Sequence, residues 1–207
     1  MSQFSSEVST SAQRVESELG LPSGFLEALQ EEDDWSFLVK THALVEAAAA
    51  HALVAMTGIT SAHDFFSRLD LSSSKTGKVS LAKALGLLSS EERRFIRSLS
   101  ELRNFFVHDV RNVGVSFDEY FSGLSKQKRM EYGKAFCYVD LNHPQIEVSD
   151  GEAVERLLSE PKRFIWSAAM VIVAVLQLQV ETRRFERDAE DHIEQVAARL
   201  GPRESEA

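Results

Sequence analysis

The stretch "SSEERRFIRSLSELRNFFVHD", residues 89–109, has the pattern of one amphipathic helix with polar residues gathered at its far end. Ser89 and Glu92 have the spacing of a capping box, in which two side chains accept hydrogen bonds from free backbone N–H groups. The apolar residues after the box step by four, three and four, which places them on a single buried stripe. They are Phe95, Leu99, Leu102 and Phe106. The stretch predicts a capped helix from about residue 90 to residue 108.

The end of this helix carries Arg103, Asn104 and His108, which we call the Arg–Asn–His trio. Asn104 and His108 are four residues apart and share one helix face. Arg103 lies at the margin of the apolar stripe. One interpretation is structural, because cations near a helix C-terminus favour the helix dipole and can hydrogen-bond its free carbonyls.

The other interpretation of the trio is a site that handles phosphate. An arginine can grip a phosphate with two hydrogen bonds, and a histidine can take or give a proton near neutral pH. In metal-independent RNA cleavage, His108 would activate the 2'-hydroxyl, Arg103 would stabilise the crowded phosphate and Asn104 would orient either group. The spacing of the residues leaves both interpretations open.

Helical patterns also fill most of the remaining chain. We expect one helix to begin after an N-cap at Ser23, a second to run over about 34–57 and a third over about 60–70. The third has Phe65, Phe66 and Leu69 as its apolar face. Four more helices cover "KVSLAKALGLL", "SFDEYF", "SKQKRMEYGKAF" and "GEAVERLLSE". A last helix spans about 161–200, and its charged second half keeps an apolar seam of Phe185, Ala189, Ile193, Val196 and Leu200. This seam predicts packing on the body of the protein or on a partner helix. The chain is therefore predicted to be an all-α helical bundle with a long C-terminal helix.

The domain organisation follows the polarity of the segments. Residues 1–20 are Ser-rich and predicted to be loosely ordered, and residues 21–138 form the helical core. Residues 139–200 provide a connection, with some extended character near Ile146 and Val148, and then helices that complete the bundle, while 201–207 is a tail.

The composition bounds the function. The net charge of -9 makes the chain a poor non-specific nucleic-acid binder, so any RNA contact needs a local basic patch. The single cysteine, Cys137, and a polar N-terminus without a secretory pattern favour the cytoplasm. The apolar run at 164–180 is shorter than the roughly 20 residues of a membrane span and predicts a buried central helix.

Metal and cofactor sites are not predicted. His42 and Glu46 share a helix face, but His51 lies nine residues beyond His42 and on the opposite face. The segment "SSSKTGK" lacks the first glycine of a phosphate loop, since Ser72 stands there, and Val79 stands where Ser or Thr is required.

The residues of the trio also carry a resemblance to a known family. "LRNFFVH" resembles the R-N-x-x-x-H signature of the HEPN superfamily (higher eukaryotes and prokaryotes nucleotide-binding domain). The run "GKVSLAKALGLLSSEERRFIRSLSELRNFFVHD", with "FLEALQEEDDWSFLVKTHALVEAAAAHAL" before it, is similar to the mannitol repressor branch. The likeness covers roughly residues 24 to 125.

This resemblance implies an all-α homodimer whose motif helices face each other across a two-fold axis. It implies that Arg103 and His108 are the catalytic pair of a metal-independent endoribonuclease, with Asn104 beside them. Other members are toxins held by an antitoxin, and the mannitol repressor branch is regulatory, which implies a non-catalytic regulator as the alternative. The basic residues available for RNA are Arg93, Arg94, Arg97 and Arg111, with Lys126, Lys128 and Arg129.

Overall fold

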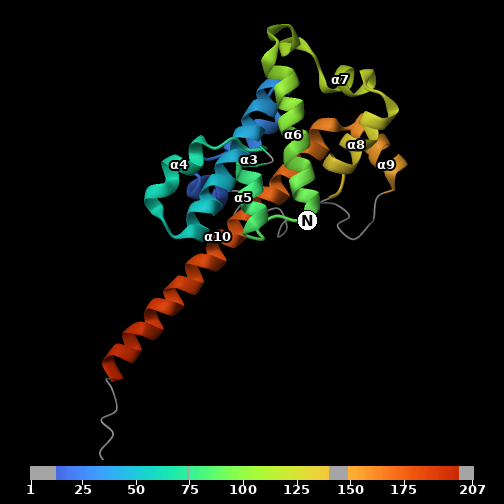
Figure 1. Ribbon diagram of the computed structural model, residues 1–207. Coiled ribbons are helices and arrows are strands. Elements are labelled where there is room, and N and C mark those ends of the chain that lie inside the picture. The colour runs from blue at the N-terminus through green and yellow to red at the C-terminus, as the bar shows by residue number, and fades with distance from the viewer. Residues whose placement is uncertain (1–12, 74, 140–148, 201–207) are drawn as a thin grey trace, which may run out of the picture.

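The computed structural model describes residues 13–73, 75–139 and 149–200, the side chain of residue 200 excepted, and within these ranges every regular element is a helix (Figure 1). The elements in chain order are α2 Phe25–Gln30, α3 Asp34–Thr57, η1 Thr60–Ala62, α4 His63–Arg68, α5 Lys78–Ala84, α6 Ser90–His108, η2 Val110–Gly114, α7 Phe117–Gly123, α8 Lys126–Phe136, α9 Asp150–Ser159 and α10 Pro161–Leu200. The all-α class and the long C-terminal helix predicted from the sequence are confirmed.

Helices α3 and α10 pack along each other and form the centre of the bundle (Figure 1). Asp33 caps α3 by accepting hydrogen bonds from the backbone of Trp35 and Ser36, and Gly58 ends it in the left-handed conformation. Small residues on both helices, such as Ala49 and Ala169, are fully buried and let the two backbones approach closely. The predicted buried helix at 164–180 is thus the first half of α10.

By length and composition alone, both α3 and α10 are also apolar enough to cross a membrane. In each helix, 56% of the apolar 18-residue stretch that passes this test is buried inside the protein, as expected of core helices.

Helix α6 has the structure that its local sequence predicts. Ser89 and Glu92 form the complete capping box. The four residues of the predicted stripe, Phe95, Leu99, Leu102 and Phe106, are fully buried. Phe106 meets Phe117 of α7 edge-to-face at a centroid distance of 5.6 Å, so the end of α6 is anchored in an aromatic cluster.

Several local expectations are wrong. Ser23 is not the N-cap of α2; the cap is Gly24, with a φ of 79°, because the buried Glu16 carboxylate accepts hydrogen bonds from Gly24 N and Leu26 N. Residues 13–18, expected to be loosely ordered, are helical. Phe65, expected on an apolar face, is 62% exposed. The expected extended character near Ile146 and Val148 lies outside the described residues.

Helix α10 changes character along its length. Up to Val180 one face of it is buried in the bundle, whereas beyond about residue 187 it leaves the body as a single exposed helix (Figure 1). The apolar seam predicted for this half therefore does not pack on the body of its own chain. Leu200, the last residue of that seam, lies outside the described side chains.

Candidate functional site

Two carbonyls at the end of α6 are bonded by residues outside the trio. Asn112 Nδ2 donates to Phe105 O at 2.7 Å, and Trp35 Nε1 donates to Phe106 O at 3.2 Å. Among the described contacts, neither Arg103 nor His108 donates to a carbonyl of the helix. Residues of α3 and η2 thus make the carbonyl hydrogen bonds that the structural interpretation assigned to the trio, and the side chains of Arg103 and His108 do not make them.

The trio itself lies on the surface, and the structure brings two of its three members together. Arg103 Nη1 donates to Asn104 Oδ1 at 3.2 Å. Arg103 is half-buried, whereas Asn104 and His108 are exposed. Five residues separate Arg103 from His108, which places them about 140° apart around the helix. No hydrogen bond or ion pair links His108 to the other two in the described part of the chain.

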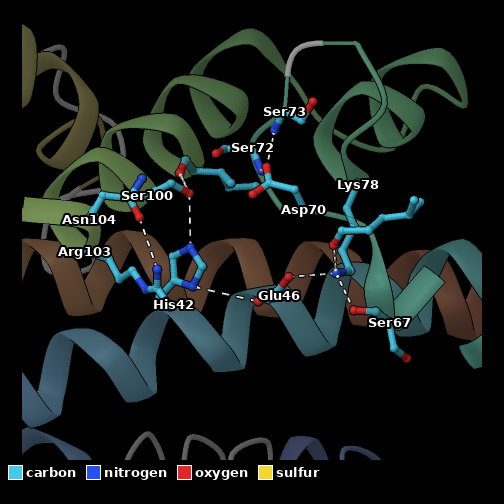
Figure 2. A network of polar contacts seen from close by, with 12 residues as sticks. His42, Glu46, Ser67, Asp70, Ser72, Ser73, Lys78, Ser100, Arg103 and Asn104 are labelled. Atoms are coloured by element: carbon cyan, nitrogen blue, oxygen red, sulfur yellow. Dashed lines mark hydrogen bonds and ion pairs between the residues drawn. The ribbon is translucent and has the colours of Figure 1, made fainter. Parts of the chain in front are cut away.

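Behind Arg103 lies His42 of α3, which holds α6 through a hydrogen bond (Figure 2). His42 Nε2 lies 3.2 Å from Ser100 Oγ, and that hydroxyl donates to Ile96 O at 2.9 Å. With its single proton directed at Ile96, Ser100 accepts from His42, so the imidazole carries its proton on Nε2. Burial lowers the pKa of His42, the carboxylate of Glu46 raises it, and the charge of Arg103 lowers it further. A neutral imidazole therefore lies next to the arginine.

The polar contacts continue from His42 to a buried lysine (Figure 2). His42 Nδ1 lies 4.0 Å from Glu46 Oε2, and Glu46 Oε1 accepts from Lys78 Nζ at 2.7 Å. The Lys78 side chain is fully buried, and its ammonium also donates to Ser67 O at 3.1 Å and to Leu69 O. We call His42, Glu46 and Lys78 the buried cluster.

The loop that precedes Lys78 explains the local sequence "SSSKTGK". Asp70 O accepts from Lys78 N at 2.9 Å, and Leu71 O accepts from Val79 N at 3.0 Å. A Cβ at Gly77 would lie 2.6 Å from the backbone N and O of Ser73, so the close approach requires glycine. The loop directs its lysine into the core against a carboxylate. Sequence reasoning missed this pairing, although the shared face of His42 and Glu46 was a partial signal.

The predicted RNA-binding residues fall into two groups. Arg93 donates to Leu88 O, and the exposed Arg111 is paired with both carboxylate oxygens of Asp109. Arg129 is partly buried, and its Nε has no hydrogen-bond partner among the described residues. Lys126 is exposed at the start of α8.

The remaining basic residues line a groove of about 290 Å³ between α6 and α8, which we call the α6–α8 groove. It contains Arg94, Arg97 and Lys128, together with Lys134, which sequence reasoning missed, and the acidic Glu101 and Glu131. Lys128 pairs with Glu131 at 2.8 Å and Lys134 with Asp150 at 2.8 Å. Arg94 and Arg97 are exposed and have no ion pair among the described residues.

The histidines on α3 do not form a metal centre. His51 lines a pocket of about 360 Å³ together with His63, Glu46 and Lys78, while His42 faces Ser100. Within the described ranges, no three His, Cys, Asp or Glu side chains are grouped so that they could hold an ion.

Comparison with known proteins adds no relative, since no family model, curated protein or solved structure matches the chain.

Proposed function

We propose that this protein is a HEPN-type, metal-independent endoribonuclease in which the Arg–Asn–His trio carries the chemistry. One observation supports the proposal above all others. The trio stands at a helix end where Asn112 and Trp35 already bond the carbonyls of Phe105 and Phe106, and the side chains of Asn104 and His108 are exposed. A purely structural arginine or histidine at a helix end would be expected to make such bonds itself.

In this proposal each residue has one role. His108 takes the proton from a ribose 2'-hydroxyl, whose oxygen attacks the adjacent phosphorus and expels the 5'-oxygen of the next nucleotide. The products are a 2',3'-cyclic phosphate and a 5'-hydroxyl, with a proton delivered to the leaving oxygen. Arg103 stabilises the charge that develops on the phosphate, and Asn104, which accepts a hydrogen bond from Arg103, keeps the guanidinium oriented.

The geometry of a single chain supports a role for a second copy. Arg103 and His108 lie about 140° apart around α6, which is too far around the helix for both to reach one phosphate easily. The family resemblance implies a dimer with motif helices facing each other, and such a pair would bring Arg103 of one copy to His108 of the other.

The α6–α8 groove supports RNA binding on the same helix. Arg97 lies on the same face of α6 as Asn104 and His108, seven residues or about 10 Å along the axis before Asn104, so a strand that reaches these two residues can also pass the groove. Contacts from Arg94 and Arg97 to phosphate would supply the sequence-independent part of the affinity, which falls as salt concentration rises.

The test is cleavage of a total-RNA pool in the presence of EDTA. We expect the wild type to cleave, and Arg103→Ala and His108→Ala to lose at least about a hundredfold in rate, as removal of a general base or charge stabiliser does. The matched controls are Arg68→Ala and His63→Ala, which remove an exposed arginine and an exposed histidine outside the trio and should keep the activity. Equal folding is verified by circular dichroism.

Two outcomes would overturn the proposal. The first is a wild-type protein without cleavage of any RNA in the pool. The second is an activity that EDTA abolishes or that both trio variants retain.

The second candidate function is a non-catalytic regulator that acts through protein contacts. The observation that favours it is an exposed apolar surface directly beside the trio, formed by Phe105, Val110 and Val113, of which Val110 is 82% exposed. In that case, cleavage would be absent in the wild type and Val110→Asp would abolish partner binding. An antitoxin that covers the trio would use the same surface.

A further inference from the structure

The second half of α10 carries an apolar stripe that the described part of its own chain leaves uncovered. Leu178 is 61% exposed, Phe185 75% and Ile193 67%, and Val196 is also exposed. Thr182 and Ala189 fall on the same stripe at helical spacing. The part of α10 beyond about residue 187 has no support from the bundle, and isolated helices shorter than about 12 to 15 residues are marginal in water. The exposed apolar stripe therefore indicates a partner.

The stripe faces away from the body of the protein. Arg187 Nη2 donates to Ala55 O, and Arg184 Nη1 reaches Glu18 Oε2 at 3.3 Å, so these arginines mark the side of α10 that faces the bundle. At about 100° per residue, Phe185, Ala189 and Val196 lie about 160° to 200° around the helix from Arg187. The bundle of the same chain therefore cannot cover them.

We propose that the stripe pairs with the same stripe of a second copy, with the two helices antiparallel and a two-fold axis at Ala189. The sequence is self-complementary about this residue. Phe185 lies four residues before it and Ile193 four residues after it, so the largest side chains of each copy meet the other copy's isoleucine. Thr182 and Val196 are related in the same way at seven residues. A small residue at the centre lets the two backbones approach closely, and a two-fold pair requires such self-complementarity.

The charges beside the stripe favour the antiparallel arrangement. The stripe has a charged flank on each side. In the antiparallel pair, each flank of one helix lies against the same flank of the other helix. One flank carries Glu181, Asp188, His192 and Arg199. The pairing places Glu181 of one copy near Arg199 of the other, and Asp188 near His192, each within about 3 Å along the axis.

A parallel pair would instead bring Glu181 and Asp188 of one copy against the opposite flank, which carries Glu186 and Glu190. That arrangement places acidic residues against one another, with Arg183, which pairs with Glu186 at 3.0 Å and with Glu190 at 3.7 Å, as the cation beside them. In the antiparallel pair Glu186 and Glu190 meet as like charges beside Arg183, and Asp188 lies within about 3 Å along the axis of Asp188 of the other copy, but the two complementary contacts on the other flank each occur twice.

This interface differs from the one that the proposed nuclease would use. The C-terminal end of α6, next to α7, lies at the opposite end of the molecule from the tip of α10 (Figure 1). Pairing through α10 therefore keeps the two trios at the far ends of the dimer. The α10 pair can form whether or not the trio cleaves RNA, and the two proposals can fail separately.

The first experiment measures the oligomeric state of the full chain by sedimentation equilibrium at micromolar concentrations. We expect the wild type to dimerise through α10, or to form a larger assembly if the motif helices pair as well. Ile193→Asp places two charges in the paired stripe and should raise the dissociation constant of the α10 contact by about 100-fold or more. The matched control is Gln195→Asp, which adds the same charge on an exposed position away from the stripe and should keep the assembly of the wild type. A monomeric wild type, or an assembly whose size Ile193→Asp leaves unchanged, would overturn the proposal.

The second experiment tests the orientation by disulfide cross-linking. Thr182→Cys and Val196→Cys are prepared separately, and the native Cys137 does not interfere because it is buried. We expect a covalent dimer when the two variants are mixed and oxidised, and little cross-linking of either variant alone. Efficient cross-linking of Thr182→Cys with itself would show a parallel pair and contradict the two-fold axis at Ala189.

Discussion

The buried cluster and the Arg–Asn–His trio contain similar residue types but differ in where their polar groups find partners. In the buried cluster, Lys78 has three acceptors, and Glu46 and His42 complete a chain of contacts within the fold. In the trio, only Arg103 and Asn104 contact each other, and His108 is exposed.

The two regions meet where Arg103 lies beside His42 (Figure 2). The comparison teaches that residue type does not decide between structure and function. What decides is whether the fold itself satisfies the polar groups. The buried cluster should therefore matter for stability and the trio for activity, and four predictions test that division.

The largest expected effect is the loss of the carboxylate that faces Lys78. Glu46→Ala leaves a fully buried ammonium with two carbonyl acceptors and no counter-charge, so we expect the free energy of unfolding to fall by about 3 kcal/mol. Urea denaturation measures it. Glu46→Gln keeps an oxygen acceptor at this position and should lose less. A loss below about 1 kcal/mol for Glu46→Ala would mean that the cluster is not structural.

A smaller loss is expected from Gly77→Ala in the loop that positions Lys78. The added Cβ would lie 2.6 Å from the backbone of Ser73, which cannot rotate away as a side chain could, so we expect about 2 kcal/mol of destabilisation. The control is Gly151→Ala in α9, where nothing lies within 4 Å and the change should be neutral or slightly stabilising. Equal thermal stability of the two variants would contradict the tight loop.

The third prediction concerns pH. Burial lowers the folded-state pKa of His42 below its ordinary value of 6.5, and burial lowers the pKa of His51 in the same direction. Above pH 6.5 the two histidines are neutral in the folded and in the unfolded chain, so neither lowers the free energy of unfolding. As the pH falls below that value, the unfolded chain binds the proton first, so the free energy of unfolding decreases.

Urea denaturation between about pH 7 and pH 5 should show this decrease. His42→Gln should remove the share of this pH-dependent decrease that comes from His42, whereas His51→Gln should leave that share unchanged. A stability that is independent of pH in the wild type would show that neither histidine is held in its neutral form.

The smallest effect on stability is expected at the trio. Asn104→Ala and His108→Ala remove exposed side chains that bond no helix carbonyl, so the free energy of unfolding should change by less than about 0.5 kcal/mol. Thermal unfolding is the measurement. A loss above 1 kcal/mol in either variant would assign the trio a structural role and remove the contrast with the buried cluster.

The sequence alone determined the features that arise within a few turns of helix. The capping box at Ser89 and Glu92, the buried stripe of α6 and the span of α10 are all confirmed, because capping and helical periodicity depend on residues close in the chain. The three residues of the trio were identified as one group in the same way, and their role stays a prediction.

Only the tertiary structure decided which polar groups are satisfied. Trp35 reaches the carbonyl of Phe106 from 71 residues away, Lys78 reaches Glu46 across 32 residues, and Glu16 caps α2 from a segment that seemed disordered by composition. Hydrogen bonds of this kind leave no periodic trace in the sequence, because each depends on how separate helices pack. The same packing buried one half of α10 and left the apolar seam of the other half exposed, since α3 ends at Thr57 and offers no surface to the later turns.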